Sequence, residues 1–269
     1  MATVNKAEVT RGKVQYHLRL KPGDVGKYVL LPGDPARSDR VAKYLENPQL
    51  IAHNREYRTF TGLYQGIKVS VTSTGIGCPS AAIAVEELAN IGAEVFIRIG
   101  SSAALKPGIA LGDLLISCGS MKNEGTSRFY VPDAFPAVPD IEFTSTLIAT
   151  ARRLQPELGF GLHLGICASD DSFYGENQEW IEKLSRLGVT NVEMESSAIF
   201  TVAHVRHCKA ASICAVSGNL VTGEVIYETE NTALVAGWEK EIKVVLEAIH
   251  TYEKQRQAQA LPGGVAGAR

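Results

Sequence analysis

The stretch Phe96-Ile97-Arg98-Ile99-Gly100-Ser101-Ser102 places one arginine in the middle of an apolar segment. A guanidinium keeps its proton in a protein, so a buried Arg98 must meet an anion or several hydrogen-bond acceptors. A glycine and two serines follow at once, where a strand would end and where ligands usually bind in α/β proteins. The stretch therefore indicates an anion site, most simply a phosphate site. The alternative is an edge strand whose arginine reaches water.

The chain has 269 residues, of which 45% are hydrophobic, and a formal net charge of -2. This length suffices for one large α/β domain with a substantial core. The near-neutral charge, without a basic stripe, argues against nucleic-acid binding. No apolar run approaches the roughly 20 residues of a membrane-spanning helix, and residues 1–14 do not resemble a signal peptide. Five scattered cysteines without a CxxC pair indicate reduced thiols in a cytoplasmic protein, and no metal site.

Strand and helix patterns alternate along most of the chain. An apolar strand at 28–31 precedes a helix expected at 36–44, and a hairpin of 57–63 with 67–71 precedes a helix at 79–90. Further strands are expected at 95–99, 114–118, 162–168 and 211–216, and helices at 144–154, 176–187, 195–207 and 231–252. The alternation predicts one α/β domain over residues 1–253, a three-layer sandwich with a mixed central sheet flanked by helices. The Gln-, Ala- and Gly-rich residues 254–269 are expected to form a disordered tail.

Two further arginines stand beside candidate turns. Pro32-Gly33-Asp34-Pro35-Ala36-Arg37 places a glycine before a helix start and an arginine one turn into the helix. Backbone N–H groups at a helix start favour anions, and Gly33 lets a ligand approach the main chain closely. Arg55 precedes the strand that starts at Tyr57. With Arg98 these arginines could converge on one anion, although each alone could equally be a solvated side chain near a turn.

Two more junctions carry candidate ligand groups. Residues 73–80, Ser-Thr-Gly-Ile-Gly-Cys-Pro-Ser, join a strand to a helix but match neither a dinucleotide-binding fingerprint nor a Walker A loop. Asn191-Val192-Glu193-Met194-Glu195-Ser196 ends a short strand and starts a helix. One of its carboxylates could accept two hydrogen bonds from a pair of vicinal hydroxyls. Alternatively, both acidic residues could favour the helix N-terminus through its dipole.

These motifs follow one another along the chain as Gly33-Asp34-Pro35, Arg37, Asn54-Arg55-Glu56, Ser73-Thr74-Gly75-Ile76-Gly77, Arg98-Ile99-Gly100-Ser101 and Glu193-Met194-Glu195. In this order they resemble the hexameric type of nucleoside phosphorylase, a family that includes uridine, purine nucleoside and methylthioadenosine phosphorylases. The resemblance extends from about His17 to about Tyr252. It implies phosphorolysis, in which a nucleoside and phosphate give a free base and a pentose 1-phosphate. It also implies a hexamer built as a trimer of dimers, with active sites shared between subunits.

The resemblance assigns roles to individual residues. Phosphate would be bound by Gly33, Arg37, Arg98 and Ser101 of one subunit, with Arg55 of a neighbouring subunit. Ribose would be bound by Glu193, Met194 and Glu195, with His17 across the dimer interface. Arg98 and Glu195 would be the catalytic residues. No metal or organic cofactor is implied, although some uridine phosphorylases hold a monovalent cation between subunits, at positions matched by Glu56, Ile76 and Ser80.

Two segments bear on which base is cleaved. Purine-acting members commonly carry an aspartate, after the strand matched by 211–217, that protonates or hydrogen-bonds purine N7. The pattern in this chain is Val216-Ser217-Gly218-Asn219, so that acid is missing. The Ser-Asp-x-Phe-Tyr motif of uridine phosphorylases is present as Ser169-Asp170-Asp171-Ser172-Phe173-Tyr174, but the arginine that follows it in bacterial members is not. The expected base-binding residues are Phe173, which would stack on the base, Gln178, Ser217, Gly218 and Asn219.

For the choice of base, the missing aspartate is stronger evidence than the missing arginine. Loss of the aspartate removes a chemical function, whereas loss of the arginine removes only one contact. The sequence therefore predicts a uridine phosphorylase, which converts uridine and phosphate to uracil and ribose 1-phosphate in nucleoside salvage. A purine nucleoside or methylthioadenosine phosphorylase is the alternative. A non-catalytic nucleoside-binding relative is a second alternative, although nucleoside binding alone would not need three arginines for phosphate.

Overall fold

Strands and helices alternate along the chain in the computed structural model, which describes residues 9–225 and 232–260. The strands are β1 (Tyr28–Leu31), β2 (Glu46–Asn54), β3 (Tyr57–Tyr64), β4 (Ile67–Thr72), β5 (Val95–Ala104), β6 (Leu114–Asn123), β7 (Leu162–Asp170), β8 (Asn191–Glu193), β9 (Lys209–Asn219) and β10 (Glu224–Val225). The helices are α2 (Pro35–Ala42), α3 (Cys78–Asn90), α4 (Ile141–Leu158), α5 (Gln178–Arg186), α6 (Ser196–Val205) and α7 (Thr232–Ala260), with short 3-10 turns at Ser127–Phe129 and Phe173–Gly175.

The strands form one mixed sheet in the order β10-β9-β6-β7-β8-β5-β1-β4-β3-β2. A mixed sheet with flanking helices in one domain confirms the predicted fold class. The sheet has one property that the sequence does not predict, because β5 pairs with β9 as well as with β1 and β8. The strands β9, β6, β7, β8 and β5 consequently close into a ring.

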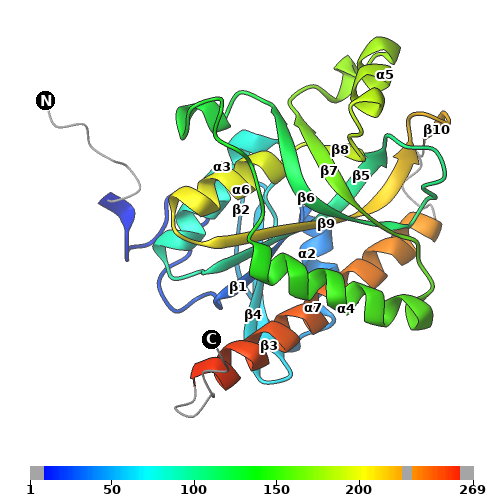
Figure 1. The fold of residues 1–269 in the computed structure, drawn as a ribbon. Coiled ribbons are helices and arrows are strands. Elements are labelled where there is room, and N and C mark those ends of the chain that lie inside the picture. The colour runs from blue at the N-terminus through cyan, green and yellow to red at the C-terminus, as the bar shows by residue number, and fades with distance from the viewer. Residues whose placement is uncertain (1–8, 226–231, 261–269) are drawn as a thin grey trace, which may run out of the picture.

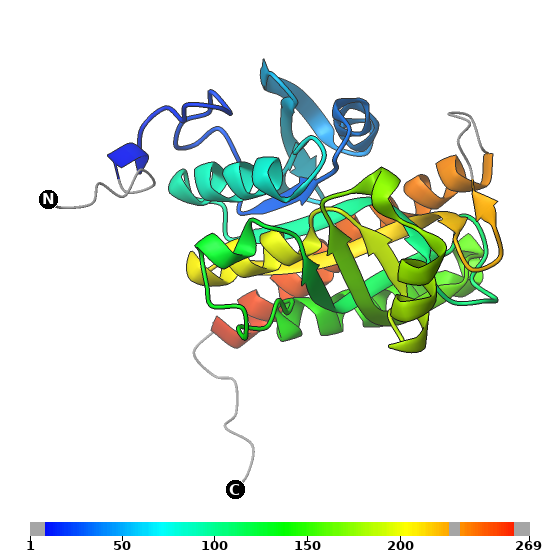
Figure 2. The same cartoon turned by 90° about the horizontal axis from the view of Figure 1, so that it is seen from above.

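The helices cover the two faces of the sheet in pairs. Helices α4 and α7 pack side by side on one face, and α3 and α6 pack side by side on the other (Figures 1 and 2). Side chains that alternate along β1 divide between these two layers, as the period of a strand requires. Tyr28 and Leu30 belong to the hydrophobic cluster of α4 and α7, whereas Val29 and Leu31 belong to that of α3 and α6.

The same alternation orients the stretch around Arg98 in β5. Ile97 and Ile99 pack in the cluster of α4 and α7, so Arg98 points to the opposite face, the face of α3 and α6. Arg98 lies beside Leu31, the last residue of β1, in a parallel register. Gly33 follows two residues later, so the end of β1 brings this glycine next to the arginine.

Several elements differ from the sequence-based expectation: β10 was not expected, and β5 and β6 each continue five residues past the expected ends at 99 and 118. Strand β2 was not expected, and most of its side chains are exposed or only partly buried, so its sequence carries no clear hydrophobic alternation. Helix α7 continues to Ala260, so residues 254–260 are helical and not part of a disordered tail. The rest of that expected tail, 261–269, lies outside the described residues.

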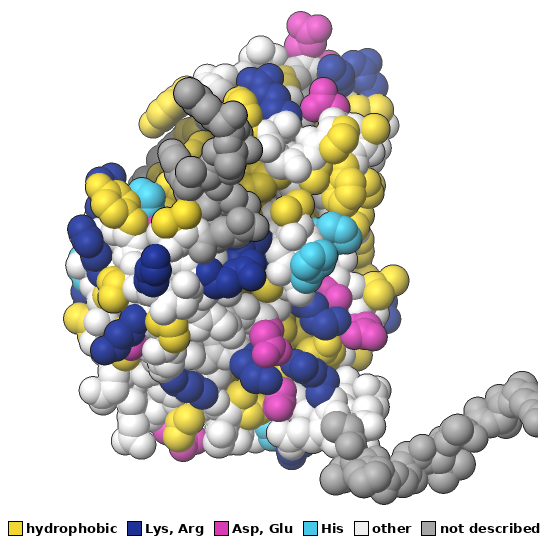
Figure 3. Space-filling model, turned by 90° about the vertical axis from the view of Figure 1, so that its left-hand side faces the viewer, with side chains coloured by type: hydrophobic (Ala, Val, Ile, Leu, Met, Phe, Trp, Pro, Cys, Tyr) yellow, Lys and Arg dark blue, Asp and Glu magenta, His cyan; other side chains and the backbone are white. Residues whose placement is uncertain are grey.

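The charge distribution on the surface and the state of the cysteines agree with what the composition predicts. On the face drawn in Figure 3, Lys and Arg side chains are interspersed with acidic, hydrophobic and neutral groups and do not gather into one basic stripe. None of the helices described has both the length and the hydropathy needed to cross a bilayer. All five cysteines are free thiols.

Candidate active site

A cavity of about 930 Å³ lies beside the carboxyl ends of β1 and β5. It brings together most of the residues that the sequence singles out from five separate segments. Those that line it are Gly33, Arg37, Arg98, Ser101, Phe173, Glu193, Met194, Glu195, Ser217 and Gly218. The predicted convergence of phosphate-, ribose- and base-binding positions is therefore present in the geometry of one subunit.

Gly33, Arg37 and Arg98 converge at one part of this cavity. A Cβ atom added to Gly33 would lie 3.9 Å from Nη1 of Arg98 and 4.0 Å from Nη2 of Arg37. The carboxylate of Asp34 accepts a hydrogen bond from the N–H of Ala36 at 2.9 Å and caps α2, which fixes the helix start beside the glycine. Burial and the neighbouring charge of Arg98 lower the pKa of Arg37. Two guanidinium groups held this close favour an anion between them.

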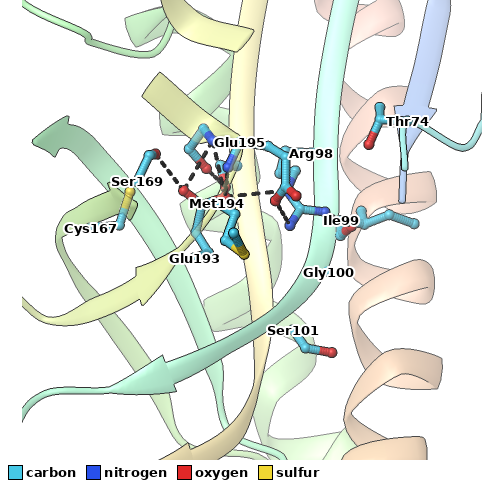
Figure 4. Close-up of polar contacts among 12 residues, drawn as sticks. Thr74, Arg98, Ile99, Gly100, Ser101, Cys167, Ser169, Glu193, Met194 and Glu195 are labelled. Atoms are coloured by element: carbon cyan, nitrogen blue, oxygen red, sulfur yellow. Dashed lines mark hydrogen bonds and ion pairs between the residues drawn. The ribbon is translucent and has the colours of Figure 1, made fainter. Parts of the chain in front are cut away.

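Arg98 is 4% exposed and meets two carboxylates. Its Nη2 pairs with Oε2 of Glu195, and its Nε lies 3.3 Å from Oε2 of Glu193 (Figure 4). Its Nη1 donates to the carbonyl of Ile99 at 2.9 Å. Burial is the largest single influence and lowers the pKa of Arg98, but the surrounding groups, led by the carboxylate of Glu195 and including Glu193 and Glu241, together outweigh it, and the net shift is upward. The alternative of an edge-strand arginine that reaches water is therefore wrong.

Glu193 and Glu195 make different contacts although they stand only two residues apart. The carboxylate of Glu193 accepts the backbone N–H groups of Glu195 and Ser196 at 3.0 Å, so it caps the start of α6. It also accepts a hydrogen bond from Oγ of Ser169 at 2.6 Å (Figure 4). The helix-terminus interpretation of this motif therefore describes Glu193, which holds α6 and Arg98 in place.

Glu195 faces the cavity from the last position before α6. It is 3% exposed, and burial raises its pKa while Arg98 opposes that shift. One carboxylate oxygen accepts the N–H of Gly77 at 2.8 Å, and the other pairs with Arg98. These contacts fix the carboxylate in one orientation, which suits a group that must accept two hydrogen bonds from vicinal hydroxyls.

Two residues of α7 support the site and were missed in the sequence. The indole Nε1 of Trp238 donates to Oγ of Ser101 at 3.0 Å, and the guanidinium of Arg37 lies 5.0 Å from the centre of the indole ring. Glu241 accepts the N–H of Gly100 at 2.6 Å, and burial raises its pKa to about 8. The two residues are three positions apart on one helix and therefore share a face. That spacing is the only signal in the sequence, and it does not reveal which strand the face meets.

The structure corrects two expected base contacts. Gln178 begins α5 as an exposed residue and donates to Oε1 of Glu182 at 3.0 Å, away from the cavity lining. Asn219 is 1% exposed, and its amide donates to the carbonyls of Lys106 and Ile109. The oxygen of that amide accepts the N–H of Val221 at 3.1 Å. Asn219 therefore holds a loop together and has no free group for a base.

Arg55 and His17 do not line the cavity of their own chain. Arg55 occupies the turn between β2 and β3 with a φ of 55°, and its side chain is exposed. Nδ1 of His17 lies 2.6 Å from Oε1 of Glu87, a residue of α3. Within one subunit the anion site thus contains two of the three predicted arginines.

The residues expected to hold a monovalent cation lie at the glycine-rich turn of residues 73–80. Oγ of Ser80 donates to the carbonyl of Ile76 at 3.2 Å, and the side chain of Glu56 packs against Gly75. Within residues 9–225 and 232–260, no group of three or more His, Cys, Asp and Glu side chains is arranged to hold a metal ion.

Comparisons with known proteins agree with this geometry. The sequence pattern of the phosphorylase superfamily matches residues 27–250. A uridine phosphorylase of Thermococcus kodakarensis is 44% identical over 86% of this chain and 90% of its own length. A guanosine phosphorylase of Halorubrum lacusprofundi is 41% identical over 78% of this chain and 85% of its own. The crystal structure of a Toxoplasma gondii purine nucleoside phosphorylase in complex with immucillin-H aligns with a TM-score of 0.82 at 33% identity, over 90% of this chain and 97% of the other. The fold, the cavity and these relatives together show that this chain belongs to the phosphorylase superfamily, as an enzyme of its nucleoside phosphorylase group.

Proposed function

We propose that this chain cleaves uridine with phosphate to give uracil and ribose 1-phosphate. The observation that carries the proposal is the convergence of Gly33, Arg37 and Arg98 beside the carboxylate of Glu195 in one cavity. Arginines supply the charge that a phosphate dianion needs, and a buried carboxylate supplies the acceptor that a ribose needs. The more similar of the two relatives compared above is named a uridine phosphorylase.

Phosphate would bind between the guanidinium groups of Arg37 and Arg98, with the backbone at Gly33 close by. Ser101 lines the same cavity, and its hydroxyl oxygen accepts hydrogen bonds from the indole of Trp238 at 3.0 Å and from Nη1 of Arg37 at 3.5 Å. Such groups act by positioning the nucleophile below the sugar and by stabilising charge as it develops. Arg98 would share its donors between the incoming phosphate and Glu195.

The ribose would be oriented by Glu195, which accepts hydrogen bonds from its 2′ and 3′ hydroxyls. Cleavage of the glycosidic bond builds positive charge on the sugar, and a nearby carboxylate favours that charge. Met194 lines the cavity beside it and would contact the sugar through its apolar side chain. In this proposal Glu193 acts on the sugar only through the position that it gives to Glu195 and Arg98.

The identity of the base rests on Gly218, which lines the cavity where purine-acting members carry an acid. A glycine cannot deliver a proton to purine N7, so the purine route lacks its general acid. Uracil needs no such acid, because the negative charge that develops on N1 as it leaves spreads over its two carbonyl oxygens. Phe173 would stack on the base from the turn that follows β7.

A shared active site is part of the same proposal. Arg55 would reach the phosphate, and His17 the 5′ hydroxyl, of a neighbouring subunit, because both lie outside the cavity of their own chain. A hexamer of three dimers would provide these neighbours. The reaction as written needs no metal or organic cofactor, and a monovalent cation beside Glu56, Ile76 and Ser80 would serve the interface alone. A cytoplasmic location fits the five free thiols.

The experiment measures free-base release from uridine, inosine, guanosine, adenosine and methylthioadenosine, each with and without phosphate. Uracil release that requires phosphate, and exceeds purine release, is the expected result. Purine release that requires phosphate would retain phosphorolysis but overturn the assignment of the base. Release without phosphate would replace phosphorolysis by hydrolysis. No release from any of the five would favour a nucleoside-binding protein without turnover.

A further inference from the structure

Glu176 is a carboxylate that the reaction described above leaves without a function. It lines the cavity together with Phe173 and Tyr174 of the segment that follows β7. The facing segment, at the end of β9, contributes Ser217, Gly218 and Leu220. Among the described lining residues of these two segments, Glu176 carries the only carboxyl group. It therefore stands where the base would lie, beside the aromatic ring expected to stack on it.

The carboxyl group of Glu176 has no hydrogen-bond or ion-pair partner within the part of the chain that the structure describes, where only burial and the charge of Asp170 act on it. Its side chain is half-buried and lines the cavity. Two of the five residues expected to bind the base are engaged elsewhere, because Gln178 bonds to Glu182 and Asn219 bonds to loop carbonyls. Among the described residues, Glu176 is thus the carboxyl group of this part of the cavity with unused hydrogen-bonding capacity.

The surroundings of Glu176 favour its neutral form. Burial and the nearby carboxylate of Asp170 raise its pKa to about 7. Asp170 is itself held by hydrogen bonds from Asn123 and from the N–H of Ser172. The other titratable groups that line the cavity are Tyr174 on the same segment, Asp34, Arg37, Arg98, Glu193 and Glu195. The carboxyl group of Glu176 therefore changes its charge within the physiological range of pH.

We propose that Glu176 reads the base, and that its neutral carboxylic acid pairs with the N3–H and an adjacent carbonyl of uracil. This inference rests on the proposed cleavage of uridine. A neutral carboxylic acid has one donor and one acceptor side by side, whereas a carboxylate only accepts. The uracil edge presents the complementary pair, a donor N–H beside a carbonyl oxygen. An ionised Glu176 would accept the N–H but would repel the carbonyl.

The substitution Glu176→Gln separates these two states of the side chain. A glutamine amide offers the same donor and acceptor as the neutral acid, but at every pH. We expect kcat/KM for uridine in Glu176→Gln to lie within about threefold of wild type at pH 6. Above pH 7 wild type should lose activity relative to the variant, by about tenfold for each pH unit. The comparison is made at saturating phosphate, so that the ionisation of phosphate affects both proteins equally.

Two further variants complete the design. Glu176→Ala should raise KM for uridine, and weaken binding of free uracil, by about 10- to 100-fold, because the imide would face no partner. Glu179→Gln removes an exposed carboxylate three residues away and should follow the wild-type pH profile. Unchanged uracil binding in Glu176→Ala would overturn the assignment. Parallel pH profiles of wild type and Glu176→Gln would overturn pairing through the neutral acid.

A failure of the proposed function would look different. If the wild-type enzyme cleaved guanosine and left uridine intact, the base assignment itself would fall. Guanine presents two donors, N1–H and the 2-amino group, which suit an ionised carboxylate. Glu176→Gln would then lower kcat/KM for guanosine, and that outcome would overturn the pairing with uracil.

Discussion

The guanidinium of Arg98 and the carboxylate of Glu195 form an ion pair in which both side chains are 4% exposed. Each is a residue that the proposed reaction needs, one for phosphate and one for ribose. The pair holds both groups at one point of the cavity, because a buried charge without a partner is costly. Substrate binding would redistribute the hydrogen bonds of this pair without creating an unpaired charge. We therefore expect catalysis and stability to depend on the same contact.

Arg98→Ala should abolish phosphorolysis and also destabilise the fold. Loss of one charged donor to the phosphate is expected to lower kcat/KM by about 10²- to 10³-fold or more. The carboxylates of Glu193 and Glu195 would remain buried without their partner, at a cost of about 3–5 kcal/mol in the free energy of unfolding. Activity is measured at a temperature where circular dichroism shows the variant folded. Arg153→Ala, which removes an arginine that is 56% exposed and paired with Glu247, is the control and should change little. Near-normal phosphorolysis by folded Arg98→Ala would contradict the phosphate assignment.

Gly100→Ala should displace the guanidinium of Arg98 although it adds only a methyl group. The new Cβ would lie 2.5 Å from Nη1 and 2.8 Å from Cζ of Arg98, distances that the side chain cannot tolerate. We expect KM for phosphate to rise at least tenfold, because even a small displacement of a positioning group is costly. Gly119→Ala in β6 is the matched control, since its nearest contact would be an ordinary 3.7 Å to the carbonyl of Ala137. Equal phosphate kinetics in both variants would show that Arg98 has room to move.

Glu241 should make the stability of the folded chain depend on pH. Its pKa in the folded state is about 8 because of burial, whereas an unfolded glutamate titrates near 4.3. The folded state therefore keeps a proton that the unfolded state has lost. Protonation of Glu241 therefore contributes fully to the free energy of unfolding below about pH 4. As the pH rises from 4 toward 8, that free energy falls by at most about 1.4 kcal/mol for each pH unit.

The variant Glu241→Gln is neutral throughout, so this decline should disappear while the bond to the N–H of Gly100 can be kept. Thermal unfolding of both proteins between pH 5 and pH 9 tests this. Wild type should lose Tm relative to Glu241→Gln as pH rises, and parallel curves would refute the buried titration.

Gly218→Asp should shift the choice of base toward purines. Gly218 lines the cavity, so an aspartate at this position would place a general acid beside the leaving base. We expect the ratio of kcat/KM for inosine to that for uridine to rise by at least tenfold. The companion substitution Val221→Asp puts the same acid outside the cavity lining and should leave the ratio unchanged. An unaltered ratio in Gly218→Asp would mean that this segment does not face the base.

Much of the fold follows from local sequence patterns. The strands β1 and β4 and helix α3 are apolar segments with regular periodicity, so their places along the chain are predictable to within a residue or two, as is the start of β5. Strand β2 carries exposed side chains, and it is a strand because β3 pairs with it. The closure of the sheet through β5 and β9 joins residues more than a hundred positions apart. No local pattern records such a pairing.

The candidate site was likewise predictable from the sequence only in part. The sequence by itself determined which residue types are present, namely an arginine within an apolar strand, a glycine before a helix start and two glutamates at a strand end. The charge and hydrogen-bonding groups of these residue types suit an anion and a sugar in any fold. Residue type alone could not separate Glu193 from Glu195; the family resemblance gave the catalytic role to Glu195, and the structure adds that Glu193 caps α6.

The tertiary structure decided which groups meet. It placed Trp238 and Glu241 of α7 against Ser101 and Gly100 and turned Gln178 and Asn219 away from the cavity. It also left Glu176 in the cavity without a partner among the described residues. Burial and proximity of segments distant in the chain cause these outcomes, since desolvation and pairing act through space. Sequence thus specified the chemistry available to this protein, and packing determined which side chains can use it.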